Sequence, residues 1–140
     1  MSKSDTSKYA NPKFLAQDIL SRRSHTEYEL TIKLKKKGVK QQDIEETLNW
    51  LREKKYIDDE ETAQQYIEQT LRRKAVGPMW IKSKLRQKGI DVDVINTAIE
   101  SNYPDKQEVK ERAITAWKKS HSKHADDKIR LQRFLISRGF

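Results

Sequence analysis

Three copies of one short pattern decide the fold of this chain: KLKKKGV at residues 33–39, KLRQKGI at 84–90 and FLISRGF at 134–140. In each copy a leucine stands four positions before a glycine, and an apolar residue follows the glycine. The glycines are separated by 51 and then 50 residues: Gly38, Gly89 and Gly139. A pattern that returns at this interval predicts three similar structural units within the 140-residue chain.

The pattern is typical of the end of a helix. A residue just past a helix often adopts the left-handed conformation, which glycine enters without steric cost. The apolar residue after the glycine then folds back onto the leucine of the last turn. Lysines and arginines in that turn complement the partial negative charge at the end of the helix. We therefore expect a helix to end at each of the three glycines.

Around these helix ends, the first repeat reads as three helices. We expect the first over about residues 12–23, because its apolar residues recur at helical spacing. Thr26 and Glu29 form a capping-box pattern that predicts the start of the second helix, which Gly38 ends. We expect the third helix over about residues 41–54.

Similar signals divide the rest of the chain. Asp58 is a predicted N-cap, and Pro78 suits the first position of a helix. Asp91 and Asp105 are further N-caps, the latter in a box with Glu108. The second helix of the last repeat is expected to start near Asp126 or Asp127. The predicted organisation is a flexible tail at 1–12, repeats at 13–57 and 58–103, and an incomplete third repeat at 104–140.

The composition favours an anionic partner and disfavours several other classes. The net charge is +9, and charged residues make up 36% of the chain. The absence of cysteine excludes disulfide bonds and thiol catalysis. No apolar run approaches the roughly 18 residues of a membrane helix, so we expect a cytoplasmic protein with no membrane partner.

Basic residues recur in the predicted second helices and at the ends of the first helices. For any single lysine, solvation and the helix dipole are a sufficient explanation. For the recurring set, a surface that binds an anionic partner is the preferred hypothesis. The candidate binding residues are Arg22, Arg23, Lys33, Lys35, Lys36, Lys37, Arg72, Arg73, Lys74, Lys82, Lys84, Arg86, Lys88, Lys118, Lys119, Arg130 and Arg133.

Catalytic and metal-binding patterns are weak. The acidic run DDEE at 58–61 is expected from capping of a helix start. His121 and His124 have helical spacing for a metal, but a third convincing ligand is missing from the sequence. His25, beside the Thr26 cap, is interpreted as structural. We expect a protein that is not an enzyme and uses no cofactor and no metal.

The stretches SRRSHTEYEL, KLKKKG, YIDDE, GPMWIKSKLRQKGI and RLQRFLISRGF, in this order, resemble the RecX family of regulatory proteins over about residues 14–140. The resemblance implies an all-helical, elongated array of three-helix repeats that resemble degenerate helix-turn-helix units. It also implies binding within the helical groove of the RecA–DNA filament, which restrains ATPase activity, strand exchange and filament extension. We expect a monomer whose partners are RecA, the RecA–DNA filament, and single- and double-stranded DNA. A basic helical DNA-binding protein without a specific RecA contact is the alternative.

Overall fold

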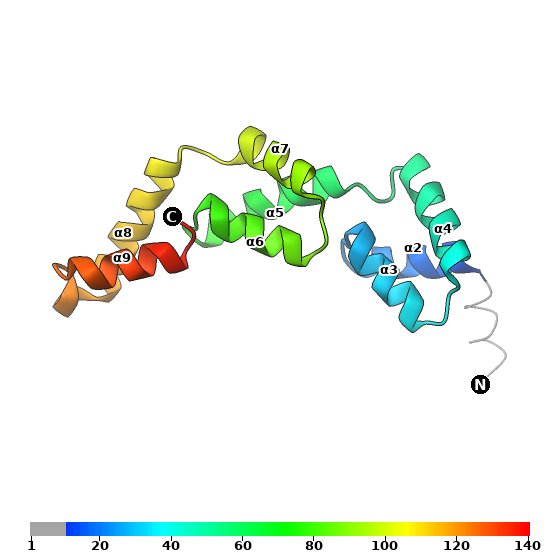
Figure 1. The fold of residues 1–140 in the computed structure, drawn as a ribbon, viewed down its shortest axis with the longest axis horizontal. Helices are drawn as coiled ribbons and strands as arrows, with labels where there is room; N and C mark the ends of the chain where they lie inside the picture. Colours follow the sequence, from blue (N-terminus) through cyan, green and yellow to red (C-terminus); the bar gives the residue numbers. More distant parts are fainter. Residues whose placement is uncertain (1–10) are drawn as a thin grey trace. The chain divides into compact units, whose positions relative to one another are not determined.

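A computed structural model describes residues 11–140, and every regular element in this range is a helix (Figure 1). None of these helices is long and apolar enough to cross a lipid bilayer. The predicted flexible tail lies largely outside the described residues, but its last two positions are ordered by a helix, since Asn11 caps α2 and Pro12 begins it. The helices are α2 (Pro12–Arg22), α3 (Glu27–Lys36), α4 (Gln41–Glu53), α5 (Asp59–Arg73), α6 (Pro78–Gln87), α7 (Val92–Asn102), α8 (Lys106–Ser120), the short 3-10 helix η1 (Ser122–His124) and α9 (Lys128–Ser137).

The prediction that a helix ends at each repeated glycine is confirmed. Helices α3, α6 and α9 each end two residues before one of these glycines, whose φ angles of +85°, +81° and +87° are left-handed. After the first, the Val39 N–H donates to the Leu34 carbonyl at 3.0 Å. After the third, the Phe140 N–H donates to the Leu135 carbonyl at 3.0 Å. These bonds satisfy carbonyl groups that the helix end would otherwise leave without a donor.

The predicted helix starts are also present, with one difference. The Thr26 side chain accepts from the Glu29 N–H at 3.1 Å, and the Glu29 carboxylate accepts from the Thr26 N–H at 3.0 Å. At α8, the expected box with Glu108 is not the bond that forms. The Asp105 carboxylate accepts instead from the Gln107 N–H at 2.8 Å, one of the two amides that an N-cap side chain can reach.

Asp58 caps α5, and replacing it with alanine tests the strength of this cap. Its Oδ1 atom accepts from the N–H groups of Glu60 and Glu61 at 3.0 and 3.3 Å. We expect Asp58→Ala to lower the free energy of unfolding by about 0.5–2 kcal/mol, because both N–H groups lose their acceptor. Urea unfolding measures the change, and Asp58→Asn is the control because it keeps the acceptor oxygen. Equal losses in the two variants would mean that charge, and not the cap bond, is responsible.

The chain forms two compact units. Among the described residues, the first comprises 11–62 together with Lys88–Ile90. In it, α2, α3 and α4 enclose a core of aliphatic side chains that includes the fully buried Leu30, Leu34 and Ile44. The segment Lys88–Ile90 is held by the Thr26 hydroxyl, which donates to the Lys88 carbonyl at 2.6 Å. Thr26 therefore both caps α3 and anchors a segment that is distant in sequence.

The second unit is Ala63–Gln87 together with Asp91–Phe140. The start of α6 and the end of α9 are in contact here, since the Gly77 N–H donates to the Arg138 carbonyl at 2.7 Å. The Tyr103 hydroxyl donates to the Val76 carbonyl at 2.7 Å, and burial raises the pKa of this tyrosine to about 12. Between α8 and α9, the rings of Trp117 and Phe134 stack at 6.2 Å. The last repeat is thus joined to α6 by main-chain contacts.

Candidate functional site

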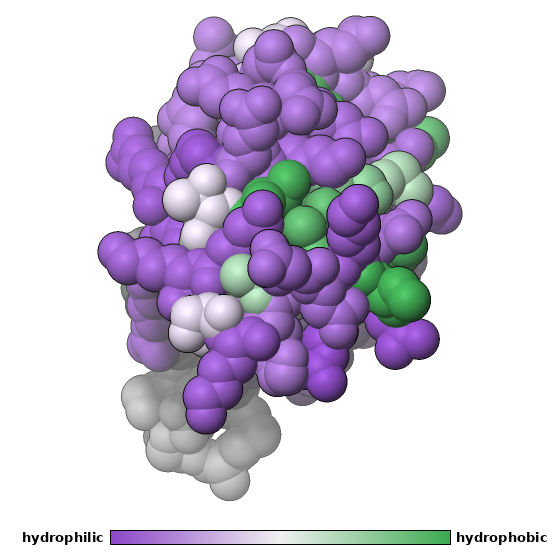
Figure 2. Space-filling view, turned by 90° about the vertical axis from the view of Figure 1, so that its left-hand side faces the viewer, coloured by the Kyte–Doolittle hydropathy of each residue, from purple (hydrophilic) through white to green (hydrophobic). Residues whose placement is uncertain are grey.

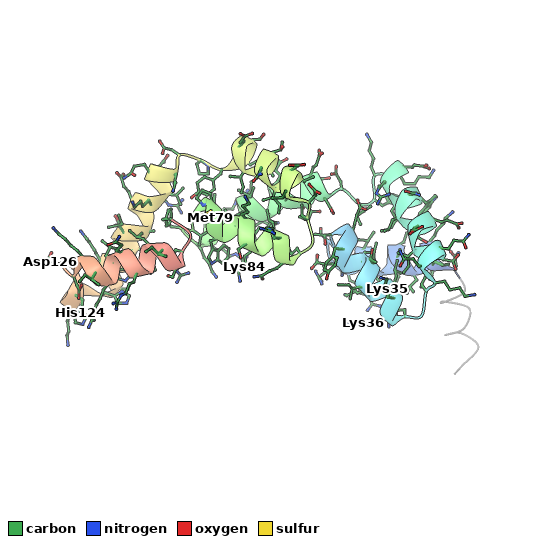
Figure 3. All side chains as sticks on the ribbon, in the orientation of Figure 1. Lys35, Lys36, Met79, Lys84, His124 and Asp126 are labelled. Carbon is green, nitrogen blue, oxygen red and sulfur yellow. The ribbon has the colours of Figure 1, made fainter. Side chains whose placement is uncertain are left out.

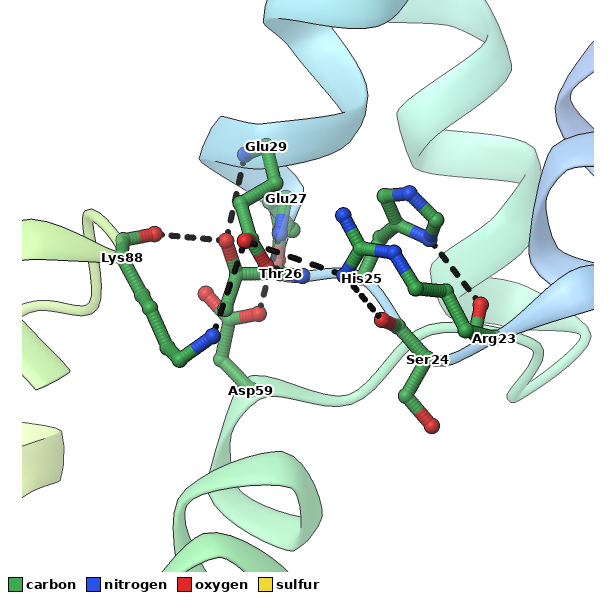
Figure 4. Close-up of polar contacts among 8 residues, drawn as sticks. All are labelled: Arg23, Ser24, His25, Thr26, Glu27, Glu29, Asp59 and Lys88. Atoms are coloured by element: carbon green, nitrogen blue, oxygen red, sulfur yellow. Dashed lines mark hydrogen bonds and ion pairs between the residues drawn. The ribbon is translucent and has the colours of Figure 1, made fainter.

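Some of the candidate binding residues are already paired with a carboxylate of the protein, and others are not. At the start of α3, the Lys88 ammonium lies 3.7 Å from the Glu29 carboxylate, and the Arg23 guanidinium lies 4.0 Å from it (Figure 4). Burial alone would raise the pKa of Glu29, but the hydrogen bond from Thr26 and the two positive charges hold it below its ordinary value. Lys88 therefore has a structural role in the first unit.

Two further acidic residues, Glu27 and Asp59, make contacts at the start of α3. The Glu27 N–H donates to the Asp59 carboxylate at 3.1 Å, and Arg52 donates to the Glu27 carboxylate from Nε at 3.0 Å and also from Nη2. Burial raises the pKa of Asp59, against the effect of the Glu27 N–H. These partners could not be predicted from the sequence, because 25 or more residues separate them.

Five of the candidate residues surround one pocket in the first unit. This pocket has a volume of about 550 Å³ and lies beside α2 and α3. Its lining contains a single carboxylate, Asp18, which pairs with Arg22 at 3.5 Å. The aliphatic side chains of Leu15 and Ile19 and the ring of His25 complete it. The candidates around this unit-1 pocket are Arg22, Arg23, Lys33, Lys36 and Lys37.

Lys35 lies on α3 beside Lys36 but does not line this pocket (Figure 3). Its side chain is exposed, as is that of Lys36. Lys36 therefore lines the unit-1 pocket and Lys35 does not, although both are lysines of the same repeated pattern.

In the second unit, α6 carries basic residues of two kinds. Lys82 and Arg86 line a shallow pocket of about 550 Å³ beside the exposed Met79. Lys84 is half-buried, and its ammonium lies 5.3 Å from the centre of the Trp80 ring, which Lys74 also approaches at 5.5 Å. A cation over an indole ring is attracted by its electrons, so Lys74 and Lys84 are positioned by Trp80.

The other candidates lie at or near helix ends, except Arg133, which lies in the middle of α9. The guanidinium of Arg130 lies 3.2 Å from the Asp127 carboxylate, which caps the same helix. The remaining side chains are exposed: Arg72, Arg73, Lys118, Lys119 and Arg133. The face drawn in Figure 2 is covered mainly by hydrophilic side chains, with small hydrophobic patches between them.

The histidines near η1 have contacts of their own. The His121 ring stacks on Trp117 at 4.9 Å, and its Nδ1 atom lies 3.0 Å from the Trp117 carbonyl. His124 is the last residue of η1, and Asp126 lies in the turn between η1 and α9 (Figure 3). Within residues 11–140, no three side chains of His, Asp or Glu are grouped so that they would hold a metal ion.

Comparisons with known proteins identify the family. The description "RecX, first three-helix domain" fits residues 15–51, and "RecX, second three-helix domain" fits residues 58–99. A protein named Regulatory protein RecX from Cronobacter sakazakii is 31% identical over 136 residues, which cover 89% of this chain and 82% of that protein. The chain belongs to the RecX family. The fold class expected from the sequence, tandem three-helix domains without strands in the described residues, is confirmed.

Other members of the RecX family agree with this assignment. Regulatory protein RecX from Legionella pneumophila is 31% identical and covers 87% of this chain and 81% of its own length. A crystal structure of regulatory protein RecX matches 95% of this chain and 68% of that one, with a TM-score of 0.84 at 26% identity. RecX from Lactobacillus salivarius matches with a TM-score of 0.83 at 25% identity, over 96% of this chain and 90% of that one.

Proposed function

We propose that this protein regulates the RecA recombinase by binding RecA and its DNA filament, and that it inhibits ATPase activity, strand exchange and filament extension. Membership of the RecX family is the observation that carries the proposal. The exposed basic side chains of both units support it, because a nucleoprotein filament offers phosphates and acidic side chains as partners.

The proposed activity is binding, without catalysis, a cofactor or a metal. It takes place in the cytoplasm, where the recombinase and its DNA are found, and a monomer suffices for it. The competing function is direct DNA binding without a specific contact to RecA. Both functions use a basic surface, so charge alone does not separate them.

An ATPase assay at saturating single-stranded DNA distinguishes the two. A regulator that contacts RecA inhibits ATP hydrolysis even when excess free DNA is present, and it co-sediments with preformed RecA filaments. A protein that merely competes for DNA loses its effect as DNA is added. Inhibition that disappears in excess DNA would contradict the proposal and favour the DNA-binding alternative.

The basic side chains of α6 allow a second test. We expect Lys82→Gln with Arg86→Gln to weaken RecA inhibition, because these residues line one pocket on the surface. If both contact DNA phosphates, the logarithmic salt slope on single strands should flatten by about 1.4, or about 0.7 for each lost contact. Reduced inhibition with an unchanged salt slope would favour contacts to RecA itself.

The matched control is Lys54→Gln with Lys55→Gln, which removes the same charge from exposed positions at the end of α4. Arg52 is left out of the control because it is bound to Glu27, so its loss would weaken the fold. The stability of both double variants is checked by thermal unfolding. Equal loss of inhibition in the two would mean that only the total charge matters.

A further inference from the structure

His25 is a buried side chain with one ring nitrogen unused. Its exposed fraction is 2%, and its Nδ1 atom lies 2.9 Å from the Arg23 carbonyl. A carbonyl only accepts hydrogen bonds, so Nδ1 carries the proton. The Nε2 atom, on the other side of the ring, is buried and has no hydrogen-bond partner among the described residues. Such a group costs free energy unless something supplies the missing partner.

The surroundings of His25 indicate what that partner is. His25 belongs to the lining of the unit-1 pocket, where five cationic side chains face one carboxylate. The cations are long and exposed, so they can move to admit a ligand, while the histidine is held by its main-chain bond. When His25 is protonated, its Nε2 atom becomes a hydrogen-bond donor beneath a rim of positive charges. This arrangement suits a compact anion with several acceptor oxygens.

We propose that the unit-1 pocket binds a phosphate group, with the Nε2–H of protonated His25 as the buried donor and Lys33, Lys36 and Arg22 at the rim. Phosphate fits better than a carboxylate because its oxygens point in several directions and reach donors on both helices. The phosphate comes from a DNA backbone or from a free phosphate compound. The proposal does not depend on a contact with RecA, so either can fail without the other.

Binding of an anion here is coupled to a proton. Burial lowers the pKa of His25, and the nearby charges of Arg23 and Lys33 lower it further, while the Arg23 carbonyl and Glu29 act in the opposite direction. A bound anion favours the imidazolium and raises the pKa again. Between the free and the bound pKa, binding takes up one proton. Affinity therefore increases as the pH falls through this window.

The other charged groups near His25 do not reverse this increase in affinity at lower pH. From α2 and its end they are Asp18, Arg22 and Arg23, and from α3 they are Glu29, Lys33, Lys36 and Lys37. None of the charged residues described on α4 lines the pocket. Histidine is the residue type whose charge ordinarily changes near neutral pH, and His25 is the one histidine in the lining of this pocket.

The first measurement uses the full chain and sulfate. Sulfate keeps the same charge between pH 7.5 and 5.5, whereas phosphate does not. NMR follows the ring nitrogens of His25 during the titration. We expect the Nε2 resonance to shift as sulfate binds, and the affinity to rise at least about threefold from pH 7.5 to 5.5. In His25→Asn, which keeps a donor for the Arg23 carbonyl, the pH dependence should disappear. An Nε2 resonance that does not move at saturating sulfate would overturn the proposal.

The second measurement leaves His25 unchanged, so it holds even if the histidine variant fails to fold. Lys33→Gln with Lys36→Gln removes two charges from the rim and should weaken sulfate and inorganic phosphate binding about tenfold. The control is Lys35→Gln with Lys40→Gln, which removes the same charge from nearby exposed positions outside the pocket. It should change affinity by less than about twofold. Equal losses in the two variants would contradict a defined site.

Three ligands then identify the source of the anion. A thymidine oligonucleotide that shifts the Nε2 resonance of His25 assigns the pocket to a DNA phosphate. A shift with inorganic phosphate and none with the oligonucleotide assigns it to a free phosphate compound, and either result supports the proposal. A shift with a glutamate-rich peptide but with neither phosphate ligand would overturn it in favour of an acidic protein partner.

Discussion

Replacing Gly77 with alanine is expected to lower the free energy of unfolding by about 2–4 kcal/mol. A Cβ atom at this position would overlap the Gly139 carbonyl and lie 2.8 Å from the Phe140 nitrogen. These are main-chain atoms, so no side chain can rotate away to make room. The start of α6 and the end of α9 would have to separate, which would break the 2.7 Å bond from the Gly77 N–H to the Arg138 carbonyl.

Urea unfolding and hydrogen exchange measure this effect together. The amides of α9 should exchange faster in Gly77→Ala, because this helix loses its contact with α6. Ser83→Ala is the control, since Ser83 is exposed on α6 and such a change falls within about 0.5 kcal/mol. Unchanged unfolding together with unchanged α9 exchange would mean that α6 and α9 are not in this contact in solution.

Gly89→Val is the second substitution with a large expected effect, a loss of about 2–4 kcal/mol of unfolding free energy. Two causes add. Valine is strained at a φ of +81°, because its branched side chain clashes with the main chain there. In addition, a Cβ atom at Gly89 would overlap the side chain of Tyr28 in the first unit.

Gly38→Val separates the two causes, because Gly38 has a similar φ of +85° but nothing within 4 Å of an added Cβ. It should cost only the backbone strain, about 1–3 kcal/mol. The excess at Gly89 reports the overlap with Tyr28, and it should shrink when Tyr28 is replaced with alanine. If both valine variants unfold like the unchanged protein, the left-handed helix ends do not exist in solution.

Much of the local structure could be predicted from the sequence because its causes act within a few residues. Gly38 ends α3 through bonds that reach back no more than five positions, and Thr26 caps α3 through Glu29, three positions away. Asp58 similarly uses amides two and three positions on. These interactions depend on chain geometry that every helix shares, so a pattern of residue types is sufficient to identify them.

The candidate site was predictable only as a set of charges. The sequence shows that Lys33, Lys35 and Lys36 are basic, but it does not show that Lys33 and Lys36 line a pocket while Lys35 does not. Likewise, Lys88 belongs to the repeated pattern, yet its ammonium pairs with Glu29. Which lysine is paired depends on which helices approach each other, and that is set by packing of the whole unit.

By itself, the sequence determined that this protein is built from helices, where most of them begin and end, and that it resembles the RecX family. Only the tertiary structure decided that Gly77 meets Gly139, that Thr26 holds the Lys88 carbonyl 62 residues away, and that His25 is buried beneath a basic rim. The physical reason is distance along the chain. Helix ends and caps are chosen by neighbouring residues, whereas close approach and burial result from packing among segments that the sequence separates.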